Sequence, residues 1–441
     1  MRAVSVGINF VALNVASLAS QVITVVIALL VARQWGEARF GQYTFVLYLA
    51  GLVAILVDFG IESNVVRAVA RNRWSTSTYV INGLLLKSVL GAVAWALIAL
   101  LAWGLDSFRP LAAALLAGGA YVILRTILAF LWAIFRAHER MDVAAGMTLI
   151  SKAVLLAVTA LVIGSGGSLA VLFGSYVAVQ ALLIGLTLAY LAFGWMPAPG
   201  RIDLTLLRGL ALGSVPFAIY VVCSAMVGQI DIVVVRHFHG DAMTGYYGAA
   251  LTVITAMAFL PANATQALYP RLSQLVLKDR GVLGTHLRTA GSLALWCGLL
   301  IAAGGSLFAG PAIRVFGPSY LPAVPALALL MCAFGVDCMA CVFQSALLST
   351  NHESAVAKAY MILTVLYLLA IWWVIPRYGL VGAALMRLVL SSVFFGVWWR
   401  LIQREFPQVQ LIGVPSLQGI RSLMQARPEE PGRLVPEPWP R

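Results

Sequence analysis

Apolar residues fall along this chain in long, nearly uninterrupted runs, unlike the short periodic stretches of a water-soluble protein. Each run is long enough to cross a hydrocarbon core of about 30 Å as a helix. Twelve runs follow one another, with approximate limits 9–32, 41–61, 80–104, 110–135, 146–164, 168–194, 209–236, 244–268, 287–309, 320–349, 355–375 and 379–402. The pattern predicts an all-α integral membrane protein with about 12 transmembrane helices.

The composition agrees with this prediction. The chain of 441 residues is 62% hydrophobic and only 10% charged, whereas a soluble domain carries about 25% charged residues. The first run exceeds the apolar segment of a signal peptide, which spans about 7–15 residues, so we interpret it as the first membrane helix. The longest interior connections are predicted at 62–79, 195–208 and 269–286, and a Pro-rich cytoplasmic tail, 405–441, is expected to be mostly disordered.

A short motif after the first run recurs after the seventh. Gly36-Glu-Ala-Arg-Phe-Gly-Gln-Tyr43 matches Gly240-Asp-Ala-Met-Thr-Gly-Tyr-Tyr247, about 204 positions later. The shared glycines are typical of a tight turn that needs positive φ. The shared tyrosine is typical of the membrane–water interface. We interpret the recurrence as an internal duplication.

The duplication predicts two six-helix lobes, 1–205 and 206–404. Six crossings return the chain to its starting side, so the lobes are expected to be parallel repeats related by an axis along the membrane normal. Two such lobes facing each other predict alternating access through a central cavity.

Basic residues in the connections indicate the orientation. With the N-terminus inside, Lys and Arg number 16 in the inner segments and 6 in the outer ones. This bias predicts that both termini are cytoplasmic. The net charge of +13 is then largely topogenic, and its natural partner is the anionic lipid headgroup rather than nucleic acid.

Polar residues line one face of several predicted helices. In the first helix they are spaced by 3, 4 and 3 positions, which places them on one side. Two interpretations stay open: packing between membrane helices, or the lining of a cavity of headgroup size. The candidate lining residues are Asn14, Ser17, Gln21, Thr24, Tyr48, Tyr220, Ser224, Thr252, Thr255 and Gln266.

Six charges are predicted at membrane depth, where each costs about 2.5–3.5 kcal/mol on insertion scales. The cations are Lys87, Arg125 and Arg387, and the acids are Asp58, Asp231 and Asp337. One hypothesis is that the cations hold an anionic headgroup such as a pyrophosphate, while an acid carries a coupling proton or sodium ion. The alternative is structural ion pairing. Asp58 and Asp231 are expected nearer the helix ends, at the interface.

The sequence contains no motif of a nucleotide-dependent or metal-dependent enzyme. It has neither a Walker loop nor a Gly-rich nucleotide fingerprint after a strand. All five cysteines lie inside apolar runs, where small packing residues are common. We therefore expect a protein that is not an enzyme and that uses no cofactor and no metal.

Several motifs resemble those of a known family. They are Ala32-Arg33 before the first motif, Asp58-Phe-Gly60, Asp231-Ile-Val-Val-Val-Arg236, Gly245-Tyr-Tyr247, Pro270-Arg271 and Pro376-Arg-Tyr-Gly-Leu-Val-Gly-Ala-Ala384. Over about residues 5–405 the chain resembles bacterial polysaccharide or O-antigen flippases of the multidrug/oligosaccharidyl-lipid/polysaccharide exporter superfamily.

The resemblance implies transfer of undecaprenyl-pyrophosphate-linked oligosaccharide repeat units across the bacterial inner membrane by rocking of two lobes. The product would feed exopolysaccharide or O-antigen (lipopolysaccharide) synthesis, with polysaccharide polymerase and chain-length proteins as expected partners. A drug/cation antiporter of the same superfamily, a scaffold of a glycan-assembly complex and a membrane glycan polymerase or ligase are the alternatives.

Overall fold

All described secondary structure in the computed structural model is helical, and the description covers residues 2–58, 60–72, 75–194, 200–258, 280–350 and 352–405. The long helices are α1 (Arg2–Asp58), α3 (Thr76–Gly104), α4 (Ala112–Ala137), α5 (Met141–Gly164), α6 (Leu169–Gly194), α7 (Leu204–Met257), α9 (Arg280–Leu307), α11 (Val324–Ser349) and α12 (Glu353–Glu405). The short ones are α2 (Ile61–Arg71), η2 (Arg109–Leu111), α10 (Ala309–Arg314) and η3 (Pro318–Ala323).

Three of the long helices bend sharply at a glycine. The bends lie at Gly36 in α1 (φ 76°), Gly240 in α7 (φ 77°) and Gly379 in α12 (φ 56°). Each separates two predicted runs, because glycine adopts positive φ without a Cβ clash. Within the described residues, nine helices are long and apolar enough to span a membrane. With the three bent ones counted twice they account for the twelve predicted runs, and the predicted all-α membrane class is confirmed.

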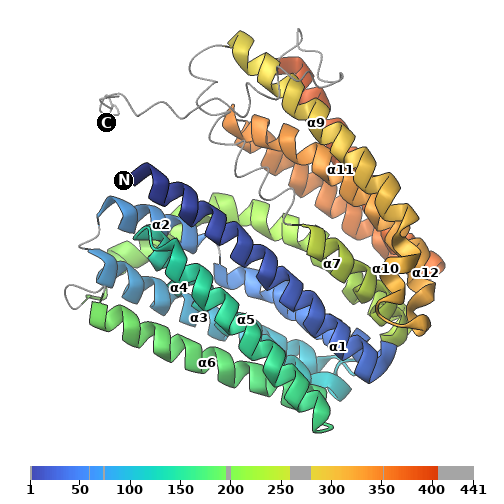
Figure 1. Ribbon diagram of the computed structural model, residues 1–441, viewed down its shortest axis with the longest axis horizontal. Helices are drawn as coiled ribbons and strands as arrows, with labels where there is room; N and C mark the ends of the chain where they lie inside the picture. The colour runs from blue at the N-terminus through green and yellow to red at the C-terminus, as the bar shows by residue number, and fades with distance from the viewer. Residues whose placement is uncertain are drawn as a thin grey trace.

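The helices form two groups that meet at one end (Figure 1). The first group holds α1 to α6, the second holds α9, α11 and α12, and α7 contacts members of both. The groups converge where α1 and α7 bend and diverge at the end where α1 begins. Because α7 packs on both groups, the lobe limits at 205 and 404 stay predictions.

The bends of the two motif glycines are alike, while the duplication itself stays a prediction. Gly36 and Gly240, equivalent in the two motifs, have nearly the same conformation, with φ/ψ of 76°/178° and 77°/−173°. Equivalent bends at equivalent positions are expected when one supersecondary plan is used twice.

The other two motif glycines serve a different purpose from the one expected. A Cβ on Gly41 would lie 1.8 Å from the carbonyl oxygen of Asp241, and one on Gly245 would lie 2.0 Å from that of Glu37. Neither has positive φ. The two turns therefore pack backbone against backbone across the interface between the repeats, which only glycine allows at this distance.

Polar and aromatic contacts surround this backbone contact. The Gln42 side-chain amide donates to Asp241 at 2.7 Å, and Arg236 donates to the same carboxylate at 2.7 Å. The Tyr320 hydroxyl donates to the carbonyl of Ala32 at 3.1 Å. The convergent end is thus closed by hydrogen bonds between the first motif region and the second half of the chain.

The expected interfacial position of the motif tyrosines is wrong. Tyr43 is 7% exposed and stacks on Phe173, with ring centroids 5.6 Å apart, and Tyr247 is fully buried. Both follow their bend by seven residues, which corresponds to about 10 Å of helix. That distance carries the rings from the membrane surface into the bundle.

The connection predicted at 62–79 contains the helix α2 instead of a loop. Ile61, Val65 and Val69, spaced four apart, are buried against α4 in a cluster that includes Phe130 and Ile134. A four-residue spacing places all three on one helix face, so α2 is an amphipathic helix. Part of 195–208 and most of 269–286 lie outside the described residues, as does the tail after 405.

We predict that Gly245→Ala destabilises the convergent end. The added methyl group overlaps the Glu37 carbonyl, and overpacking of this kind costs about 1–3 kcal/mol. Thermal unfolding in detergent is expected to shift downward, with faster hydrogen exchange at 33–43. The control is Gly185→Ala, because nothing lies within 4 Å of the new methyl group. An equal effect of both variants would contradict the role assigned to Gly245.

Candidate functional site

A cavity of about 810 Å³ lies between the two helix groups and is lined by residues of α1, α4, α7, α11 and α12. From the predicted polar faces, the wall includes Gln21, Thr24, Tyr48, Thr252 and Thr255. The Gln21 side chain donates to the backbone carbonyl of Thr255 at 2.6 Å, so the two repeats' faces meet directly.

The remaining predicted lining residues lie elsewhere. Ser17 is exposed and Ser224 half-buried, and neither is among the residues that line the cavity. The side chains of Asn14 and Tyr220, and the whole of Gln266, lie outside the described residues.

One wall of the cavity carries an unpaired cation. Arg125 of α4 lines the cavity and is exposed in it. Its guanidinium lies near the Tyr121 hydroxyl, one turn earlier. Among the described residues, no carboxylate lies within ion-pair distance of Arg125. This wall therefore presents an arginine whose charge has no protein counter-ion in the described part.

A second cation accompanies Arg125 and was missed by the sequence analysis. Lys152 of α5 is half-buried and close enough to Arg125 for the two charges to repel. The count of inner basic residues includes Lys152, although it falls within the predicted run 146–164. Since α5 begins at Met141, Lys152 lies near the middle of the helix. Asp142 in the first turn, a favourable position for an acid, was the available signal for that earlier start.

Two acids that line the same part of the cavity, Asp58 and Glu62, form ion pairs with cations. The Lys87 ammonium bonds Asp58 at 2.7 Å, with side-chain exposures of 0% and 43%. Arg136 bonds Glu62 in the same way. Asp58 and Glu62 line the cavity, whereas Lys87 does not and instead lies 5.5 Å from the Phe130 ring centroid. Lys87 thus has a structural partner and reaches the cavity only through Asp58.

The opposite wall holds a hydrogen-bonded carboxylate. Asp231 of α7 is 3% exposed and accepts bonds from Tyr367 at 2.5 Å and Tyr247 at 3.1 Å. It lies well inside the bundle and not at the interface where it was expected. The reason is the bend at Gly240, which follows Asp231 by nine residues, about 13 Å of helix.

A second acid and one arginine complete this wall. Asp337 of α11 lines the cavity and is hydrogen-bonded to Ser391. Arg387 of α12 donates to the carbonyl of Val227 and interacts electrostatically with both Asp337 and Asp231. This wall therefore has two carboxylates for one guanidinium.

The two walls consequently differ in sign. Arg125 gives the α4 wall a cation, and Lys152 of α5, which does not line the cavity, lies close to it, whereas Asp231 and Asp337 outnumber Arg387 on the α7–α11–α12 wall. An anion is favoured on the first wall and a cation or proton on the second. In the described part of the chain, no group of three or more His, Cys, Asp or Glu side chains is placed to bind a metal.

Comparisons with known proteins agree with this architecture. The sequence profile of a family described as "Polysaccharide biosynthesis protein" matches residues 6–276. A putative O-antigen transporter of Shigella flexneri is 24% identical over 177 residues, which cover 39% of this chain and 42% of that protein. The match thus spans less than half of the relative's length.

Solved membrane transporters share the fold. The lipid II flippase MurJ has a TM-score of 0.67 at 13% identity, covering 94% of this chain and 92% of its own. An inward-facing multidrug resistance MATE family transporter has a TM-score of 0.64 at 15% identity, covering 90% and 96%. A MATE transporter of Vibrio cholerae has a TM-score of 0.60 at 15% identity, covering 92% and 97%. At these identities the similarity concerns the fold alone.

We predict that the Lys87–Asp58 pair is structural. Asp58→Asn leaves a buried ammonium without its counter-ion, which costs up to about 3–5 kcal/mol. Lys87→Met combined with Asp58→Leu is expected to recover most of that loss. Thermal unfolding of Asp58→Leu, Lys87→Met and the variant that combines them gives the coupling energy. Purely additive losses would contradict the pair's structural role.

Proposed function

Because the chain belongs to the family of polysaccharide biosynthesis proteins, we propose that it is a flippase for undecaprenyl-pyrophosphate-linked oligosaccharide repeat units in the bacterial inner membrane. The observation that carries the proposal is the cationic wall at Arg125, which lines the cavity without a carboxylate partner among the described residues and has Lys152 close to it. The family match and the fold shared with transporters support it.

The cationic wall suits the headgroup of such a substrate. Two cations that repel each other gain most from a ligand with two negative centres, and a pyrophosphate has them. Arg125 offers a planar fork of donors to phosphate oxygens, and Lys152 adds a compact charge. Charge-assisted bonds contribute about 1.5–3 kcal/mol each, which is enough to determine headgroup affinity. The polyprenyl chain would remain in the bilayer while the glycan occupies the polar cavity.

The conformation suits loading from one side. The groups are closed at the end of the Gly41–Gly245 contact and diverge at the other end, as Figure 1 shows. The excess of basic residues predicts that the divergent end is cytoplasmic. The cavity would then accept substrate from the inner leaflet, and transport would require this end to close and the glycine contact to part.

The acidic wall supplies candidates for coupling to an ion gradient. Asp231 and Asp337 share one guanidinium, so a proton or sodium ion on either acid changes which partner Arg387 prefers. These residues come from α7, α11 and α12, whose relative positions would change in a rocking motion. Asp58 is engaged by Lys87, so we place coupling at Asp231 and Asp337.

The acidic wall also favours a second candidate function, export of a cationic drug in exchange for an ion. Multidrug transporters share this fold, and a cation would bind near Asp231 and Asp337. The two candidates differ in which wall holds the substrate.

The deciding experiment uses a strain that lacks this protein. We expect a complete polyprenyl-pyrophosphate-linked repeat unit to accumulate in the inner leaflet and surface polysaccharide to be lost. Normal surface polysaccharide combined with changed sensitivity to cationic drugs would overturn the flippase proposal and favour the antiporter. Lipid extraction with mass spectrometry reads the first outcome and growth inhibition reads the second.

We predict that Arg125→Ala lowers transport about ten- to a hundredfold, the equivalent of one or two lost charge-assisted bonds. Arg125→Lys should retain an intermediate rate, since it keeps the charge but not the fork. Arg109→Ala is the matched control, because Arg109 is exposed and paired with Asp106. Complementation of the deletion strain, normalised to membrane protein level, measures the rate. Wild-type transport by Arg125→Ala would refute the anion site.

We predict that Asp231→Asn uncouples transport from the ion gradient. The amide cannot exchange a proton, yet it keeps an oxygen to accept bonds from Tyr247 and Tyr367. Transport is measured in vesicles. With an imposed ion gradient, the variant should transport no faster than the wild-type protein does when no gradient is imposed. Asp142→Asn, a change on an exposed acid, serves as control. A gradient response in Asp231→Asn as large as in wild type would exclude Asp231 from coupling.

A further inference from the structure

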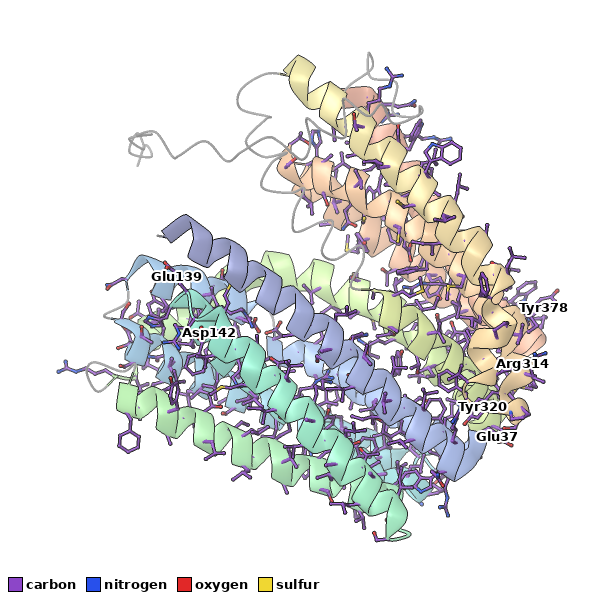
Figure 2. All side chains as sticks on the ribbon, viewed as in Figure 1. Glu37, Glu139, Asp142, Arg314, Tyr320 and Tyr378 are labelled. Atoms are coloured by element: carbon purple, nitrogen blue, oxygen red, sulfur yellow. The ribbon has the colours of Figure 1, made fainter. Side chains whose placement is uncertain are left out.

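A second pocket, of about 390 Å³, lies at the convergent end and is built by both halves of the chain. Arg33 and Gly36 of α1 form one side, and Arg314, Ser319 and Tyr320 form the other. Figure 2 shows Arg314 and Tyr320 at this end, opposite to Glu139 and Asp142. The central cavity shares none of these residues.

The two arginines have no carboxylate partner in the described residues. Arg109 and Arg236, at the same end, are paired with Asp106 and Asp241. In contrast, no ion pair joins Arg33 or Arg314 to a described acid.

The donors in the pocket remain available. The Nε of Arg33 donates to the Val315 carbonyl at 2.8 Å, which anchors the side chain and leaves its two terminal amino groups. Arg314 and Ser319 are exposed, whereas the Tyr320 hydroxyl already donates a hydrogen bond to the Ala32 carbonyl.

One acidic residue lies near the pocket. Glu37 is close enough to Tyr320 to affect it electrostatically, and Figure 2 places it beside Tyr320. It does not line the pocket. The site therefore has two guanidinium groups and one nearby carboxylate, which lies outside the pocket. Its net charge is positive.

Aromatic side chains indicate the membrane depth of this end. Trp372, Trp373 and Tyr378, which flank the bend of α12, are exposed, and Arg377 lies 4.3 Å above the Trp373 ring. Exposed Trp and Tyr beside Arg are typical of the headgroup region. The pocket therefore lies at the depth of lipid phosphates, on the face that the basic bias predicts to be outer.

We propose that this pocket binds the phosphate of a lipid headgroup in the outer leaflet and that binding holds the convergent end closed. Forked arginine donors match phosphate oxygens. Because each half contributes one arginine, the complete site exists only while the halves are in contact. A ligand that prefers one conformation shifts the population toward it.

The lipid site goes beyond the proposed function, although its effect on transport rests on the predicted orientation and on alternating access. Lipid phosphate on the outer side would favour the conformation whose cavity is open at the opposite end. It would thereby promote the return of the empty carrier, whatever the transported headgroup is.

The test uses the full-length protein in phosphate-free detergent micelles. Short-chain phosphatidylglycerol is added, and hydrogen exchange is measured by mass spectrometry at 33–43 and 312–322. We expect exchange to slow at least threefold in wild type. Arg314→Gln should abolish the effect, and this variant loses no hydrogen bond within the described chain. Arg377→Gln removes the same charge from the same face outside the pocket and should retain the effect.

Two further additions identify the source of the phosphate. A glucosyl diacylglycerol of equal chain length, which has no phosphate, should have no effect. Inorganic pyrophosphate at matched ionic strength should protect less than the lipid, and equal protection would overturn the lipid source. Equal protection in wild type and Arg314→Gln, or none in wild type, would overturn the site. Because nothing is transported in this assay, its failure is distinct from failure of the flippase proposal.

Discussion

The rest of the structure depends on the backbone contact between Gly41 and Gly245. Each glycine meets the other repeat's main chain where a methyl group would not fit. A contact of this kind is short-ranged and has no side chain to adjust, so it is either made or lost. This contact closes one end of the molecule. Around it, the hydrogen bonds of Gln42 and Tyr320 join the two halves of the chain. The cavity lies between the contact and the divergent end. The interface thereby has the two-state character that alternating access requires.

The low dielectric of a membrane explains the arrangement of the charges. A charge at membrane depth is costly unless it is paired, and an unpaired one usually has a functional role. Lys87 and Asp58 partner each other, as do Arg136 and Glu62. Arg125 lines one wall of the cavity without such a partner among the described residues and has Lys152 close to it, whereas the acids around Arg387 line the opposite side. A cavity with walls of opposite sign can separate the binding of an anionic headgroup from the binding of a coupling cation.

Fold alone does not select the substrate, since a lipid flippase and multidrug transporters share this architecture. The selection lies in a few side chains. Lys152 illustrates the point, because the sequence analysis counts it among the inner basic residues, whereas α5 places it near the middle of a long apolar helix. The pocket at the convergent end would add a second anion-binding surface, which we propose for the phosphate of a lipid headgroup.

The sequence by itself determined the all-α membrane class and the bends at Gly36 and Gly240, and it predicted the duplication. These follow from hydropathy and from the positive φ that glycine tolerates, both of which are local properties. It also indicated which polar faces to examine. Only the tertiary structure decided that Tyr43 and Tyr247 are buried, that Lys87 belongs to Asp58, and that Arg125 stands beside Lys152 without an acid in the described chain. Such pairings depend on which helices are neighbours and how far each is rotated, and the spacing of residues along one helix does not contain that information.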